Sequence, residues 1–277
     1  MPIVTFWSES QKEVGQTQTA AAVATQFAID HNVKVLLLST QYNNREIESC
    51  FWDIHKQKRN LSAIFGSAPK VSLEAGIDGL IKAVSSNKMT PEFTTNYAKI
   101  VFQDRLEVLE NFKGMESDYE KVKQMYPEII QTSSSYYDLI LIDLNKGLTP
   151  FTKAILDLST VVFYGVSQRM YTLAQAKECI EKGYLAKKTN FELYCGKYYS
   201  DSKYNRRNLE KYFKVKDLPI VPWNRLYAEA AEEGKVVDYF LKIRTIKEED
   251  PNIQFIHSIK ELSNRMLEKI KEQQMKM

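Results

Sequence analysis

The stretch that decides the fold is Val14-Gly15-Gln16-Thr17-Gln18-Thr19, which lies between an apolar run and a helix-forming run. The preceding run, Ile3–Trp7, is rich in β-branched and aromatic residues, which predicts a buried strand. After the stretch, Ala20–Ile29 predicts a helix and Val33–Leu38 predicts a second strand. A strand, loop, helix and strand in this order form one βαβ unit, and such units build parallel sheets. The start of that helix is expected to face an anion, with phosphate as the default ligand.

A second informative stretch is Tyr137–Gly147, in which four apolar residues, Leu139–Ile142, are followed by Asp143. This pattern predicts a central parallel strand with a carboxylate at its C-terminal tip. Ligand crevices in open α/β sheets lie at such tips, so Asp143 becomes a candidate site residue. Two simpler interpretations stay open: Asp143 only caps the next helix, and Gly15–Gln18 is only a helix start.

Together the two stretches resemble the MinD/ParA ATPases, whose deviant P-loop reads Lys-Gly-Gly-x-Gly-Lys-Thr between strand and helix. Laid on that pattern, the chain keeps the last glycine as Gly15 and the threonine as Thr17. Asp143 and Gly147 match the family's Asp-x-x-x-Gly after the Walker B strand. The departures are Gln11 for the signature lysine, Lys12 and Glu13 for two glycines, Gln16 for the phosphate-gripping lysine, and Ser39-Thr40-Gln41 for the family's Asp-x-Asp.

The resemblance implies a site for ATP or ADP with Mg²⁺. In the family the Walker B aspartate holds Mg²⁺ through water, and together with the loop threonine this assigns the metal to Asp143 and Thr17. Gly147 would mark the switch loop near the γ-phosphate. The run ending in Pro222 resembles the edge strand whose backbone lies beside the adenine. The nucleotide-binding residues implied in this way are Gln11, Lys12, Glu13, Gly15, Gln16, Thr17, Gln18 and Pro222.

Short apolar runs alternate with helical stretches along the chain, which predicts an α/β fold with a doubly wound, mostly parallel sheet and helices on both faces. We expect seven or eight strands (roughly, from this alternation), with Ile3–Trp7 next to Leu139–Ile142, in a single domain over residues 1–277. Further expected strands are Leu106–Leu109, Thr160–Val166, Phe191–Cys195 and Leu218–Asn224, and expected helices are Arg45–Trp52, Ile77–Val84, Tyr119–Thr132, Thr152–Leu158, Leu173–Lys182 and Ile253–Ile270. The run Tyr97–Phe102 is ambiguous between helix and strand, and Leu61–Lys70 is expected to be a loop.

Composition bounds the class of protein. The chain of 277 residues is 44% hydrophobic and 26% charged, which is typical of a soluble globular protein. Its net charge of +3 is too small to indicate nucleic-acid binding by itself. The 3 cysteines and 3 histidines show no paired spacing, which excludes a zinc site of usual spacing and favours a reducing cytoplasm. No apolar run is long enough for a transmembrane segment, and no signal peptide is expected.

Two further segments carry hypotheses. Lys197–Lys216 interleaves basic residues with tyrosines, which is typical of a solvated helix flank, a protein interface or, less favoured, a nonspecific DNA-binding surface. The helix Ile253–Ile270 has its apolar residues on one side. Both charge signs lie on its other side, so core packing is favoured over a membrane-surface anchor.

The resemblance implies a MinD/ParA-like protein with a degenerate nucleotide site, acting as a positioning or assembly factor for a pilus, secretion or partition machine. Its ATP hydrolysis is expected to be weak or absent, as in a pseudo-ATPase, and the TadZ/CpaE pilus-assembly type is the subgroup it resembles most. Protein partners and a homodimer are implied. Two alternatives stay open: an authentic ATPase that uses Lys12 after a one-residue shift of the motif, and a DNA-associating partition protein.

Overall fold

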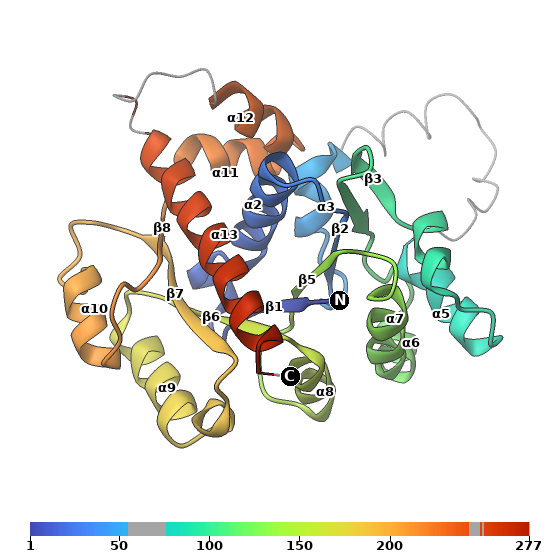
Figure 1. Ribbon diagram of the computed structural model, residues 1–277, viewed down its shortest axis with the longest axis horizontal. Helices are drawn as coiled ribbons and strands as arrows, with labels where there is room; N and C mark the ends of the chain where they lie inside the picture. The colour runs from blue at the N-terminus through green and yellow to red at the C-terminus, as the bar shows by residue number, and fades with distance from the viewer. Residues whose placement is uncertain (55–75, 244–249, 251, 277) are drawn as a thin grey trace.

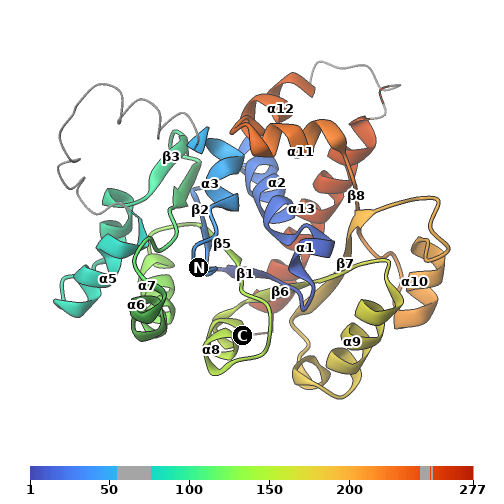
Figure 2. The same cartoon turned by 180° about the vertical axis from the view of Figure 1, so that it is seen from behind.

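The structure, a computed structural model, describes residues 1–54, 76–243, 250 and 252–276. These residues form an 8-stranded sheet in the order β3-β4-β2-β5-β1-β6-β7-β8 (Figure 1 and, from behind, Figure 2). All neighbouring strands are parallel except β3, which runs antiparallel to β4. The predicted fold class is confirmed. The strands are β1 Ile3–Trp7, β2 Val35–Ser39, β3 Lys99–Phe102, β4 Leu106–Leu109, β5 Leu139–Asp143, β6 Val161–Val166, β7 Phe191–Tyr198 and β8 Ile220–Pro222.

The centre of the sheet places the two decisive stretches side by side. Strand β1 pairs with β5, and Phe6 lies opposite Asp143, which confirms the predicted adjacency. On its other side, β5 pairs with β2, where Ser39 lies opposite Asp143. Every residue of β1, β2 and β5 is buried, because helices cover both faces of the sheet. Asp143 therefore sits at the C-terminal ends of three central strands, where parallel sheets place their ligand sites.

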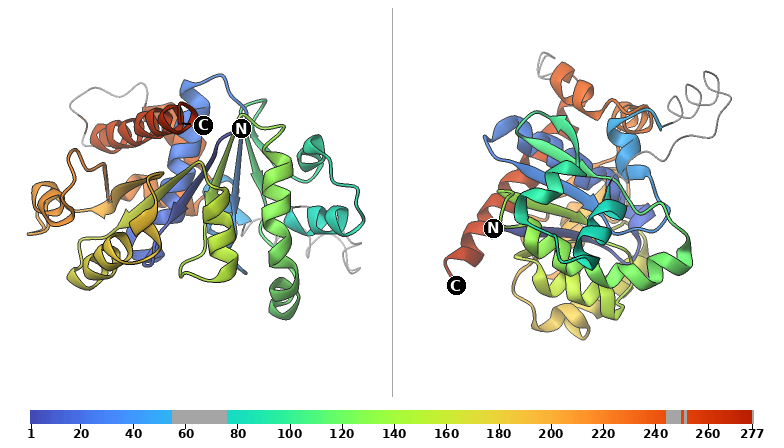
Figure 3. Two further views of the ribbon diagram at one scale, coloured as in Figure 1. Left: turned by 60° about the horizontal axis from the view of Figure 1, so that its bottom comes forward. Right: turned by 90° about the vertical axis from the view of Figure 1, so that its right-hand side faces the viewer.

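Helices form a layer on each face of the sheet, and Figure 3 shows the two layers from the side. Each layer closes its own apolar cluster against the sheet. One layer contains α2 Gln16–Asp30, α3 Glu46–Phe51, α11 Arg225–Glu232, α12 Val236–Ile243 and α13 Asn252–Gln274. The other contains α5 Ile77–Ser85, α6 Glu116–Val122, α7 Tyr126–Ser133, α8 Pro150–Leu158, α9 Met170–Glu181 and α10 Arg206–Phe213.

Helix α13 belongs to the core. Its residues Phe255, Ile259 and Met266 are buried in the same apolar cluster as α2. The apolar side of α13 is therefore covered by the protein, as the core-packing interpretation predicted. None of the helices in the described ranges is long and apolar enough to cross a membrane.

One expected helix differs from the structure, and one ambiguous run is resolved by it. The helix predicted over Tyr119–Thr132 is divided into α6, a 3₁₀ turn at Lys123–Met125 and α7. Pro127 explains the division, because proline is tolerated in the first turn of a helix but not in its interior. The ambiguous run resolves as strand β3 at the sheet edge. The loop expected at Leu61–Lys70 lies outside the described residues.

Candidate functional site

The turn between β1 and α2 is the first component of the site. Instead of the predicted open loop, Gln11–Val14 forms a one-turn helix, α1. The backbone N–H groups of Glu13 and Val14 donate to the Ser10 carbonyl at 3.0 and 3.1 Å. Lys12 and Glu13 stand where the family has glycines, and such residues favour helical backbone over the unusual torsions of a glycine-rich loop. Two N–H groups that an open loop could turn toward a phosphate are thus already bonded.

Gly15 separates this turn from α2. It has left-handed torsions, φ 66 and ψ 39, which glycine adopts without strain. The N–H groups in the first turn of an α-helix have no acceptor within the helix, and the helix dipole is positive there. The 15-residue helix α2 therefore points a set of donors toward the C-terminal edge of the sheet. This end of the site keeps its capacity for an anion.

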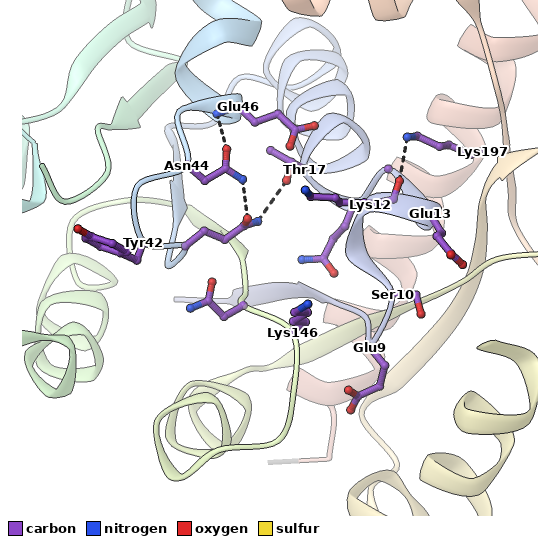
Figure 4. Close-up of a pocket in the computed structure, with 14 residues that line it drawn as sticks. Glu9, Ser10, Lys12, Glu13, Thr17, Tyr42, Asn44, Glu46, Lys146 and Lys197 are labelled. Atoms are coloured by element: carbon purple, nitrogen blue, oxygen red, sulfur yellow. Dashed lines mark hydrogen bonds between the residues drawn. The ribbon is translucent and has the colours of Figure 1, made fainter. Parts of the chain in front are cut away.

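A cavity of about 770 Å³ opens in front of this helix N-terminus (Figure 4). Three lysines, Lys12, Lys146 and Lys197, lie on its wall. The carboxylate of Glu13 is already paired with Arg169 at 2.6 Å. The full lining is Glu9, Ser10, Lys12, Glu13, Gly15, Gln16, Thr17, Gln41, Tyr42, Asn44, Glu46, Asn145, Lys146 and Lys197. Lysines beside a helix N-terminus give the chemistry of a site for a phosphate-bearing ligand.

Asp143 lies behind the cavity, and four side chains donate hydrogen bonds to it. Gln16 Nε2 donates to Oδ1 at 2.7 Å. Three donors share Oδ2: Thr17 Oγ1 at 2.9 Å, Ser39 Oγ at 3.1 Å and Gln41 Nε2 at 2.7 Å. The carboxylate is fully buried. Both of its oxygens are therefore occupied by neutral donors of the chain itself.

Burial dominates the protonation of this carboxylate. It raises the pKa of Asp143 to about 6, while the hydrogen bonds from Gln16, Thr17 and Ser39 oppose the rise. Desolvation disfavours the charged form of an acid, and donors to the charged form favour it. At neutral pH Asp143 is mostly ionised, and the four donors stabilise its charge.

Gln16 occupies the position of the family's phosphate-gripping lysine, but its side chain turns inward. Its Nε2 also donates to the carbonyl of Leu144 at 2.8 Å. Because both partners are acceptors, the orientation of the amide is fixed. Its other atom, Oε1, is buried without a hydrogen-bond partner. Gln16 thus links the start of α2 to the end of β5 and leaves one acceptor unsatisfied.

This donor set does not fit Mg²⁺ at Asp143. The metal requires oxygen lone pairs at roughly 2.0–2.1 Å in octahedral geometry. Here amide N–H groups of Gln16 and Gln41 already donate to the two carboxylate oxygens, which leaves no free acceptor for the metal or for a water bound to it. Among the described residues no cluster of three or more His, Cys, Asp or Glu is arranged to hold a metal. Thr17 and Asp143 lie next to each other, as the resemblance implies. They are joined by a hydrogen bond from the Thr17 hydroxyl to the Asp143 carboxylate.

The predicted nucleotide-binding residues fall into two adjoining places. Five of them line the main cavity: Lys12, Glu13, Gly15, Gln16 and Thr17. Gln18 and Pro222 instead line a narrow crevice of about 20 Å³, to which Gly15 and Lys197 also belong. The side chain of Gln11 lies outside the described part of the structure. Their role in nucleotide binding stays a prediction.

Gly147, the predicted switch glycine, has a left-handed φ of 80 and lies one residue beyond the cavity residue Lys146. Its backbone forms a hydrogen bond to Glu9, another cavity residue. Burial raises the pKa of Glu9, and this hydrogen bond opposes the rise. The loop is therefore connected to the cavity wall, and its role as a switch stays a prediction.

Sequence reasoning missed Lys197 as a site residue and placed it in a basic surface segment. Lys197 lies at the C-terminal end of β7, and its Nζ donates to the Lys12 carbonyl at 2.8 Å. Its position directly after a buried strand was the available signal, because strand ends line the crevice. Gln41 was named only as a lost aspartate, and the structure gives it a bond to Asp143.

The rest of the segment Lys197–Lys216 contributes little aromatic surface. Tyr198, Tyr204 and Tyr212 pack against the core, whereas Tyr199 is exposed and stacks on Trp223. Arg206 is paired with Glu210 and Glu261. Most of the tyrosines are thus explained by packing, which supports the solvated-flank interpretation for α10.

The sheet order, the strand–turn–helix at its centre and the carboxylate at the tip of β5 define the P-loop NTPase fold of the MinD/ParA type. No protein-family model and no curated protein sequence matches the chain.

Solved structures do match it over nearly the whole length. A ParA family ATPase from Chlorobium tepidum TLS gives a TM-score of 0.72 at 13% identity, with 95% of this chain and 98% of that chain covered. The septum site-determining protein MinD from Pyrococcus horikoshii OT3, complexed with Mg-ADP, gives 0.64 at 16% identity, with 97% and 98% covered. A chain of the MinC:MinD cell division protein complex of Aquifex aeolicus gives a TM-score of 0.64 at 14% identity, with 96% of each chain covered. At these identities the likeness establishes the fold.

Proposed function

We propose that this chain is a MinD/ParA-like protein with a degenerate nucleotide site, which positions or assembles a larger machine through protein contacts. Pilus, secretion and partition machines are the candidates, with a TadZ/CpaE-type role in pilus assembly as the most specific form. ATP or ADP binds at the cavity in front of α2, and hydrolysis is very slow or absent. The structural relatives include a MinD that is in complex with MinC, which supports a role through protein partners.

The observation that carries the proposal is the direction of Gln16. Phosphoryl transfer depends on positioned positive charge around the transferred group. In this site the residue at the lysine position is neutral, and its amide donates to Asp143. Losing one preorganised charge-stabilising group commonly lowers a rate by about a hundred- to a thousandfold. Ser39 and Gln41 are neutral where the family has two aspartates, so these two carboxylates are missing as well. The rate losses from several such changes need not add.

A steady-state assay with Mg-ATP tests the proposal. We expect turnover far below about one per minute, because about one per minute is the rate of a slow but active P-loop NTPase. Thr17→Ala is the matched control, because it removes the hydroxyl that every catalytic version of this loop would use. Turnover near one per minute that disappears in Thr17→Ala would establish an active ATPase and contradict the proposal. Co-purification of the tagged chain with components of such a machine tests its assembly role.

A further inference from the structure

The hydrogen bonds to Asp143 make this carboxylate unavailable to a metal ion, whereas the N-terminus of α2 can still bind a phosphate. Four donors of the chain point at the carboxylate of Asp143 at the tip of β5. A cation at either oxygen would displace a 2.7 Å bond from an amide N–H. The same amides cannot turn to offer their oxygens without breaking these bonds, since Gln16 Nε2 also donates to Leu144. Both oxygens of the carboxylate assigned to the metal are therefore occupied by donors of the chain.

Lys197 places a positive charge at the α2 N-terminus from another part of the sheet. Its backbone has φ 44, a left-handed conformation that is uncommon outside glycine and marks a constrained position. Its side chain lies directly on Gly15, where an added Cβ would come within 2.9 Å of Lys197 Cε. The ammonium then reaches the Lys12 carbonyl at 2.8 Å (Figure 4). A bond to a backbone carbonyl is one that a charged phosphate oxygen can replace with a stronger one.

We propose that the cavity takes a metal-free nucleoside di- or triphosphate, and that the Lys197 ammonium supplies the positive charge that the loop lacks at Gln16. The inference rests on the proposed function, because it names the ligand form of that same site. Lys12 and Lys146 line the same cavity and add to the attraction.

Titration calorimetry with ADP tests the inference on the full chain, freed of bound nucleotide, in parallel buffers with excess Mg²⁺ or with EDTA. We expect the two dissociation constants to agree within about threefold, because Asp143, the carboxylate that the resemblance assigns to the metal, already accepts from four donors of the chain. In EDTA, Lys197→Met is expected to weaken ADP binding at least about tenfold, since a charge-assisted contact is lost while the methionine still covers Gly15. Lys203→Met is the matched control, because Lys203 is exposed in the same segment and its ammonium lies over the Tyr204 ring.

Three results of these titrations would overturn the inference. ADP binding that requires Mg²⁺, or no ADP binding in either buffer, overturns the inference. So does a Lys197→Met protein that melts like the parent and binds ADP equally well. Lys197→Arg keeps the charge and is expected to keep the affinity; if it binds as weakly as Lys197→Met, the charge is not the cause. Mg-ATP turnover sensitive to Thr17→Ala would instead contradict the degenerate site of the proposed function. ADP binding that needs Mg²⁺, or that does not depend on Lys197, overturns this inference alone, whereas no ADP binding in either buffer contradicts the nucleotide site of both.

Discussion

Replacing Gln16 with leucine tests whether Asp143 is an ionised acceptor inside the core. The folded-state pKa of Asp143 is raised to about 6 from the ordinary value of 3.8. An acid with a raised pKa costs the folded state free energy when it ionises. That cost is absent below about pH 4 and complete above about pH 6, so stability falls across this window. Gln16→Leu removes one donor to the charged form, so the cost should grow on the alkaline side.

The magnitude follows from the bonds in the structure. Above about pH 6 the variant loses a bond to a charged group, worth about 1.5–3 kcal/mol. Near pH 4.5 the same bond goes to a neutral carboxyl and is worth about 1 kcal/mol. The lost bond to Leu144 and the removal of the unpaired Oε1 act at both pH values and cancel in the comparison. Gln16→Leu should therefore destabilise the protein by about 0.5–2 kcal/mol more at pH 7.5 than at pH 4.5.

Urea denaturation of the parent and the variant at these two pH values measures the difference. Gln175→Leu is the control, because Gln175 donates at 3.2 Å to the Tyr171 hydroxyl, an exposed and neutral acceptor. Its effect on the free energy of unfolding should be the same at both pH values. An effect of Gln16→Leu that does not depend on pH would refute an ionised Asp143 as the acceptor.

Two further predictions concern packing. Gly196→Ala should lower the free energy of unfolding by at least about 2 kcal/mol in urea denaturation, because the new Cβ would lie 2.0 Å from the Val14 carbonyl oxygen; unchanged stability would mean that this approach is wrong. Ile259→Ala should cost about 2–5 kcal/mol, since Ile259 is fully buried on α13, whereas His257→Ala on the exposed side should stay within about 0.5 kcal/mol. Equal losses for this pair in thermal denaturation would contradict the core assignment of α13.

The fold could be predicted because its central strands are local in sequence and buried on both faces. Ile3–Trp7 and Leu139–Ile142 are continuous apolar runs, and such runs belong in the middle of a parallel sheet. Helix interiors were harder where a proline interrupts an amphipathic pattern, as at Pro127. The helical turn α1 escaped prediction because the family pattern implied a loop, whereas Lys12 and Glu13 decide the backbone locally.

The chemistry of the site was less accessible from the sequence. A glutamine at the lysine position indicates a lost charge, but not where its amide points. That direction depends on the register between α2 and β5, which brings Gln16 within 2.7 Å of Asp143. Lys197 reaches the site only because β7 is ordered two strands away from β1 in the sheet. Contacts of this kind join distant parts of the chain, and local patterns do not encode them.

The packing of α13 on α2 has a consequence for how the protein is made. Helix α2 is synthesised early, yet one of its apolar sides is closed by α13, which follows near the end of the described chain. The central strand β5 likewise arrives well after the strands β1 and β2 that it separates. During synthesis, α2, β1 and β2 therefore keep apolar surface exposed until their later partners, β5 and α13, have left the ribosome. A nascent chain halted before α13 should bind chaperones and be cleaved readily by proteases. After release of the full chain, chaperone binding should stop and protease resistance should rise.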